Sequence, residues 1–191
     1  MKLIRVAATA ALALFVVAAA QARADSSDIG EPVALGIDIG TSAINALMGT
    51  AAVSLSLDLP LGHPLSLTLQ TAGSWAPGAG SSAFQLSLIA QARFYFISLF
   101  VPENGQANWG PFVAAGAAVA WNRQLSDSIL DAVSFGPDVE GGYRLVFGDR
   151  GIFIEPTVGW IALYGARFDV EGPSPVTSNG YSAGLTLGYR F

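Results

Sequence analysis

Cysteine is absent from this chain of 191 residues, and lysine occurs once, at Lys2. Without cysteine there can be no disulfide, no thiolate metal site and no lipidated cysteine after a signal peptide. The single histidine, His63, leaves mainly carboxylates as metal ligands, so we expect no metal site and no cofactor. Charged residues make up only 12% of the chain, about half of the roughly 25% in ordinary soluble domains.

A long apolar run is also missing, since no stretch reaches the roughly 20 apolar residues of a membrane-spanning helix. The apolar run Val6 to Ala20 belongs to a different pattern. A basic start precedes it, and Ala22-Arg23-Ala24 follows it as a small-x-small cleavage site. We therefore predict a secretory signal peptide over residues 1–24 and a single domain over residues 25–191.

The charge that remains after cleavage is strongly acidic. The predicted signal peptide contains three of the nine basic residues and none of the 14 acidic ones, which leaves six arginines and a formal net charge of −8. Nucleic-acid phosphates are neutralised by clustered Lys and Arg, so this composition argues against a nucleic-acid partner. A chain that is 52% hydrophobic needs either a large dry core or contact with lipid.

The pattern along the chain favours lipid contact. Apolar and polar residues alternate with period two, most regularly in Ala52 to Leu59 and Leu65 to Thr71, and this period is typical of strands. In the clearest segments one face is almost entirely aliphatic or aromatic and the other is polar. The remaining segments fit less strictly, and Pro111 to Asn122 is dominated by alanine and glycine. The eight segments are Val33 to Thr41, Ala52 to Leu59, Leu65 to Thr71, Phe84 to Ile97, Pro111 to Asn122, Phe135 to Phe147, Ile152 to Arg167 and Tyr181 to Phe191.

These segments predict an all-β, eight-stranded, antiparallel transmembrane β-barrel. A strand of about 9–11 residues crosses a bilayer when tilted, and an even number of strands closes the sheet without a free edge. A soluble eight-stranded barrel of the lipocalin kind is the alternative, but its apolar face would point inward and its polar face outward.

The connections between segments suggest which end faces outward. If both termini face the periplasm, the inner turns are 60–64, 100–110 and 148–151. We expect the outer loops to be longer, over 42–51, 72–83, 123–134 and 168–180. Aromatic residues near the two ends of the strands predict belts at the two membrane interfaces. The predicted outer belt contains Trp75, Trp121, Phe135, Tyr164, Phe168 and Tyr181, and the inner one contains Trp109, Phe147, Phe153, Tyr189 and Phe191.

The segment Gly184-Leu185-Thr186-Leu187-Gly188-Tyr189-Arg190-Phe191 resembles the last strand of bacterial outer-membrane proteins. The run from Phe135 to Trp160 is similar to an adjacent strand pair of small barrels of the OmpA and OmpW types. The resemblance implies a location in the bacterial outer membrane, lipid around the barrel, and assembly by the barrel-assembly machinery. It also implies that Tyr189 and Phe191 form the assembly signal.

Charged residues on the polar face are predicted to lie inside the barrel. Four acids and three arginines suggest a paired network, because a buried charge left without a partner costs about 3–5 kcal/mol. An eight-stranded barrel is just wide enough for side chains to fill it, so the network is interpreted as a structural plug or, alternatively, as the lining of a very narrow conduit. The seven residues are Asp38, Asp58, Arg93, Glu140, Arg144, Glu155 and Arg190.

Two motifs contain residue types found in catalytic or nucleotide-binding sites. His63 and Ser66 are the residue types of a lipid A hydrolase, but three positions of a strand separate them onto opposite faces. The run from Gly36 to Ser42 looks like a phosphate-binding turn of the actin and sugar-kinase superfamily, a fold that needs a much longer chain. We therefore predict no catalytic residues.

Three functions remain open on the sequence. The leading prediction is a non-enzymatic outer-membrane protein with an envelope-structural or surface-interaction role. The alternative is a porin-like narrow channel or a conduit for apolar solutes, and a lipid-modifying enzyme is the third. The oligomeric state stays open.

Overall fold

The computed structural model describes residues 33–62, 64–78, 82–96, 109–125, 129–148, 151–169 and 172–191. The predicted signal peptide and His63 lie outside these ranges. Among the residues described, no helix is long and apolar enough to span a membrane.

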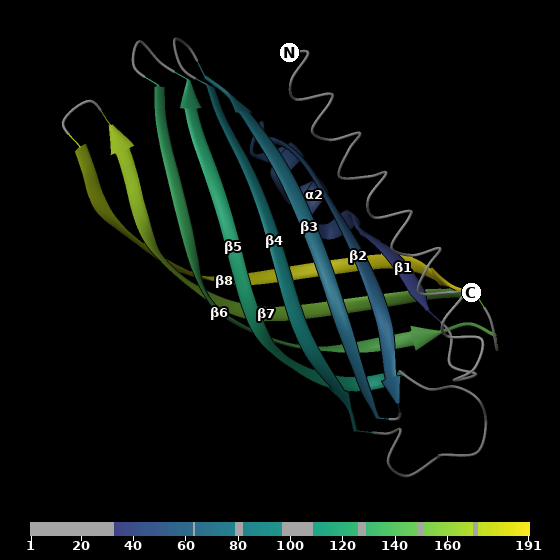
Figure 1. Ribbon diagram of the computed structural model, residues 1–191. Coiled ribbons are helices and arrows are strands. Elements are labelled where there is room, and N and C mark those ends of the chain that lie inside the picture. The colour runs from purple at the N-terminus through teal and green to yellow at the C-terminus, as the bar shows by residue number, and fades with distance from the viewer. Residues whose placement is uncertain are drawn as a thin grey trace.

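Eight antiparallel strands form a closed barrel, in which each strand pairs with its neighbour in the sequence and β8 pairs back with β1 (Figure 1). The predicted fold class is confirmed. The backbone of Phe191 donates to the carbonyl of Val33 (2.9 Å), so both ends of the described chain lie at one end of the barrel, called here the near end. The strands are β1 Ala34–Asp38, β2 Ala51–Gly62, β3 Leu65–Pro77, β4 Ser82–Tyr95, β5 Gly110–Leu125, β6 Ile129–Val146, β7 Ile152–Asp169 and β8 Gly172–Arg190.

The two faces of the wall differ as the alternation predicts. On the outward rows apolar side chains are exposed, for example Leu88 at 56% and Val158 at 67%. Leu57 is an exception, since it lies on an outward row and is fully buried. Within the described strands, the outward rows carry two charged side chains, Arg123 and Asp131, and these form an ion pair with each other (2.8 Å).

The expected strand ends were wrong at the far end. Residues 129–134 and 172–180, interpreted as outer loops, belong to β6 and β8, which are 18 and 19 residues long. The far-end connections from β3 to β4, from β5 to β6 and from β7 to β8 are therefore short, since for example β7 ends at Asp169 and β8 begins at Gly172, whereas the connection from β1 to β2 is longer. Backbone groups alone make the hydrogen bonds between strands, so pairing can continue where the outer face of the barrel no longer has to be apolar. The alternation of apolar and polar residues therefore ends earlier in the sequence than the paired strands do.

The first predicted strand also ends early. β1 stops at Asp38, and Ile39–Leu47 forms the helix α2. The Asp38 carboxylate accepts a hydrogen bond from the Thr41 backbone amide (2.9 Å) and so caps the helix. Because α2 contacts β2 and β8, it completes the wall where β1 is missing.

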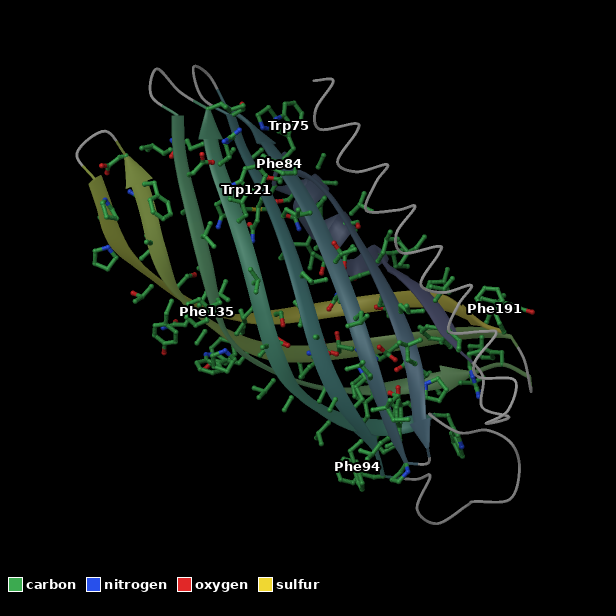
Figure 2. All side chains as sticks on the ribbon, in the orientation of Figure 1. Trp75, Phe84, Phe94, Trp121, Phe135 and Phe191 are labelled. Atoms are coloured by element: carbon green, nitrogen blue, oxygen red, sulfur yellow. The ribbon has the colours of Figure 1, made fainter. Side chains whose placement is uncertain are left out.

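Labelled aromatic side chains lie toward both ends of the barrel, and Phe135 lies between them (Figure 2). Trp75, Phe84 and Trp121 lie toward the far end, and the rings of Phe84 and Trp121 meet edge to face at 5.6 Å. Phe94 and Phe191 lie at the near end. The assignment of Phe153 to the near belt was wrong. Its position alternates with that of Ile152, so its ring points inward, where it is 1% exposed.

Candidate functional site

The inside of the barrel holds a chain of ion pairs, which we call the lumen network. It consists of Glu140, Arg93, Glu155, Arg144 and Asp58, in that order of contact. These residues come from β2, β4, β6 and β7, so the network crosses the lumen rather than following one wall. Their side chains meet because each occupies an inward position of a tilted strand.

Each contact in the lumen network is a charge-assisted hydrogen bond. Arg93 donates through Nη2 to Glu140 Oε1 (2.9 Å) and through Nη1 to Glu155 Oε1 (2.7 Å). Arg144 donates through Nε to Glu155 Oε2 (2.6 Å) and through Nη1 to Asp58 Oδ2. Glu155 therefore bridges the two arginines, and charges alternate in sign along the chain. This arrangement compensates charge inside a wall that shields it from water.

Aromatic rings cover the lumen network on its near side. The guanidinium carbon of Arg93 lies 4.5 Å from the centre of the Phe112 ring, and that of Arg144 lies 4.5 Å from the Phe153 ring. Tyr95 is fully buried, its ring centre is 5.3 Å from that of Phe112, and its hydroxyl donates to Asp58 Oδ2 (3.3 Å). Apolar and cation–π contacts thus hold the two arginines in place, in addition to the ion pairs.

Two of the seven charges predicted for the interior stand outside the lumen network. Asp38 is buried, but its carboxylate binds backbone groups: Oδ1 accepts hydrogen bonds from the backbone amides of Thr41 (2.9 Å) and Leu185 (3.2 Å). Arg190 is 1% exposed at the near end of β8. The structure therefore joins five of the seven residues in one chain of ion pairs, and Arg190 lies within electrostatic range of Arg144 and Asp58.

Sequence reasoning missed several members of this interior. Tyr95 lies two positions after Arg93, and Phe153 lies two positions before Glu155. Because residues two positions apart on a strand face the same side, the alternation would have placed both inside. Asp138, two positions before Glu140, faces the same side, and its carboxylate accepts a hydrogen bond from the side-chain amide of Gln91. Ser66, one of the two candidate catalytic residues in the sequence, is fully buried on the lumen side and so makes no contact with membrane lipid.

Beyond Arg93, toward the far end, the lumen widens into a polar pocket of about 280 Å³, which we call the vestibule. Hydroxyl, amide and carboxylate groups from every strand except β5 line it, and α2 contributes Thr41. Among the described residues, no group of three or more histidine and carboxylate side chains is placed to hold a metal ion. Other lining residues are Ser54, Gln70, Ser87, Asp138 and Thr157.

No protein-family model and no curated protein sequence matches this chain. Among solved structures, the N-terminal β-barrel domain of Pseudomonas aeruginosa OprF superimposes with a TM-score of 0.53 at 16% identity, covering 84% of this chain and 98% of that domain. The chain has the fold of a small outer-membrane β-barrel. Neisserial surface protein A aligns with a TM-score of 0.43 at 12% identity, over 83% of this chain and 92% of its own. The outer membrane protein AlkL, whose structure was determined in lipid bilayers, aligns with a TM-score of 0.45 at 11% identity, over 84% of this chain and 90% of its own.

The outer surface of this barrel fits the same location. Integral outer-membrane barrels present apolar side chains to lipid and bound them with aromatic girdles. Here the outward rows are apolar between aromatic side chains toward the two ends, among them Trp121 and Phe94, and the two outward charges neutralise each other. The barrel is therefore in contact with membrane lipid.

Proposed function

We propose that the protein is a non-conducting, non-enzymatic outer-membrane barrel with an envelope-structural role and a surface for interaction at its far end. The lumen network is the observation that supports this proposal. The side chains of Arg93, Arg144 and Glu155 are each at most 4% exposed, so little space is left between them for a solute. Opening a pore here would separate several buried ion pairs, and a buried charge that loses its partner is destabilised by about 3–5 kcal/mol.

Conductance across a planar lipid bilayer tests the sealed lumen. We expect no conductance steps from the wild-type barrel, and steps from the double variant Arg93→Ser, Arg144→Ser, which removes both cations and their long side chains. Arg123→Ser, on the outside of the wall, is the matched control and should stay silent. A wild-type barrel that conducts would contradict the proposal.

The long strands at the far end support the surface role. β7 and β8 have 18 and 19 residues against 12 in β2, and their hairpin stands apart from the other strand ends (Figure 1). Since the chain lacks cysteine, a single introduced thiol can report on this end. Thr177→Cys should react with a membrane-impermeant maleimide on intact cells, whereas Leu61→Cys, at the near end, should not. The reverse pattern would invert the orientation and remove the surface role.

A narrow conduit is the second candidate, because the vestibule already forms a polar cavity that reaches Arg93. In that case the lumen network is a gate and not a plug. Small, voltage-dependent steps from the wild-type barrel, which become larger and continuous in the double variant, would favour the conduit.

A further inference from the structure

The outside of the barrel carries a broad groove of about 720 Å³. It crosses the sheet from β3 to β8 along two neighbouring rows of outward-facing residues, each row consisting of residues that are paired from strand to strand. One row runs through Phe94, Val113, Gly141 and Val158, which are paired in succession across β4, β5, β6 and β7. β6, β7 and β8 change direction along their length (Figure 1). The groove therefore crosses the wall obliquely, from the near end of β3 and β4 to the middle of β7 and β8.

Side-chain size shapes this groove. Its centre is lined by the small residues Ala92, Ala115 and Gly141, which lie on three adjacent strands. Larger residues close its ends, with Phe94 at the near end and Tyr181 at the other. Small residues between large ones leave a channel in the surface that an elongated, flexible apolar molecule can fill.

The chemistry of the lining changes along the groove. The outward side chains are aliphatic or aromatic, and the outward groups that can donate a hydrogen bond are the Trp160 indole and the Tyr181 hydroxyl, at the same end. Tyr181 is 92% exposed and Trp160 is 36% exposed. Indole and phenol side chains favour the level of a membrane where hydrocarbon gives way to ester and headgroup atoms.

We propose that this groove binds an acyl chain of a lipid from the surrounding membrane, with the ester and headgroup of the lipid beside Trp160 and Tyr181. The groove is continuous with the lipid-facing surface, and its linear apolar part and single polar end match the two parts of a lipid. A second copy of the chain fits less well. In a symmetric pair the two concave patches would face each other and leave a void, and packing voids forfeit contact energy. The proposal does not depend on whether the lumen conducts.

Filling the groove tests this assignment. The barrel is refolded into vesicles of dimyristoyl phosphatidylcholine, transferred to detergent, and weighed by native mass spectrometry for retained lipid. Ala115→Leu fills the centre of the groove, and Ala117→Leu adds the same side chain to the next outward position of β5, outside the groove. We expect wild type and Ala117→Leu to retain a lipid adduct and Ala115→Leu to retain about tenfold less.

A second filling variant guards against a folding defect. Ala92→Leu lies opposite Ala115 on β4 and should lose the lipid as well, while circular dichroism and the heat-dependent gel shift of folded barrels verify that each variant is folded. Equal retention in both filling variants and wild type would overturn the proposal, and so would an equal loss in Ala117→Leu. A dimeric mass that Ala115→Leu abolishes would assign the groove to a second copy instead.

Discussion

At the scale of single residues, this protein depends on where its few charges lie. Arg144 touches Asp58, Glu155 and two aromatic rings, and its side chain is 2% exposed. Arg123 has an ion pair of similar length, but 40% of its side chain is exposed. The same residue type therefore plays two different parts, because water screens the outer pair and not the inner one.

Replacing Arg144 by methionine should lower the free energy of unfolding by about 3–5 kcal/mol, since Asp58 and Glu155 would lose a buried cation. Reversible urea unfolding in lipid vesicles measures the change. Arg123→Met is the control and should have little effect. If the two variants lose the same stability, the lumen network contributes no more than a surface ion pair.

The lipid-facing rows allow a second test at this scale. Leu88 lies outward between Phe84 and Phe94, the aromatic residues toward the two ends of β4, and Ser87 beside it lines the vestibule. Leu88→Arg should destabilise the barrel by about 2–4 kcal/mol if it lies near the bilayer midplane. Ser87→Arg should be tolerated far better, and equal losses in vesicle-based unfolding would mean that the two faces are assigned wrongly.

At the scale of elements, the departure from a regular barrel is α2. β1 has five residues, so its pairing with β8 ends at Asp38 and Thr186. The helix takes over part of the wall, with Thr41 and Asn45 toward the polar interior and Leu47 exposed at 87%. Asp38 joins the two elements, since it caps α2 and accepts from the amide of Leu185 on β8.

Asp38→Ala should therefore loosen the helix from β8 and cost about 1 kcal/mol, as the loss of a helix cap usually does. Hydrogen exchange of the amides in α2 should accelerate more than that of β5. Asp38→Asn keeps a capping oxygen and should largely preserve protection. Unchanged exchange in Asp38→Ala would show that β2 and β8 hold α2 in place without the cap.

At the scale of the whole molecule, closure of the barrel rests on a short seam. β1 and β8 pair over five positions, one of which joins Leu35 to Tyr189. Tyr189 also pairs with Ile152 of β7, and its ring packs on Phe191 at 5.2 Å. The proposed assembly signal and the closing contact are therefore the same residues.

Tyr189→Asp should lower the amount of folded barrel in the outer membrane, because it places a charge on the lipid face beside the closing seam. Fractionation of cells and the heat-dependent gel shift measure this amount. Tyr181→Asp changes the same residue type on the same strand, away from the seam, and should assemble better. Wild-type levels of Tyr189→Asp would contradict a role in assembly.

The sequence by itself determined the architecture. Strict alternation in segments such as Leu65 to Thr71 distinguishes the two faces, and in a bilayer every backbone donor and acceptor must be paired, which requires a closed barrel. The same alternation also predicted that five charged residues lie on the inward face, namely Asp58, Arg93, Glu140, Arg144 and Glu155.

Only the tertiary structure decided which of these charges meet. Alternation gives the face of a residue but not its height in a tilted barrel, and Asp58 and Arg144 come together from strands far apart in the chain. Alternation also could not predict α2 or the long strands at the far end. The helix depends on a local cap at Asp38, and the strand extensions depend on backbone pairing above the membrane, where the side chains carry no periodic signal.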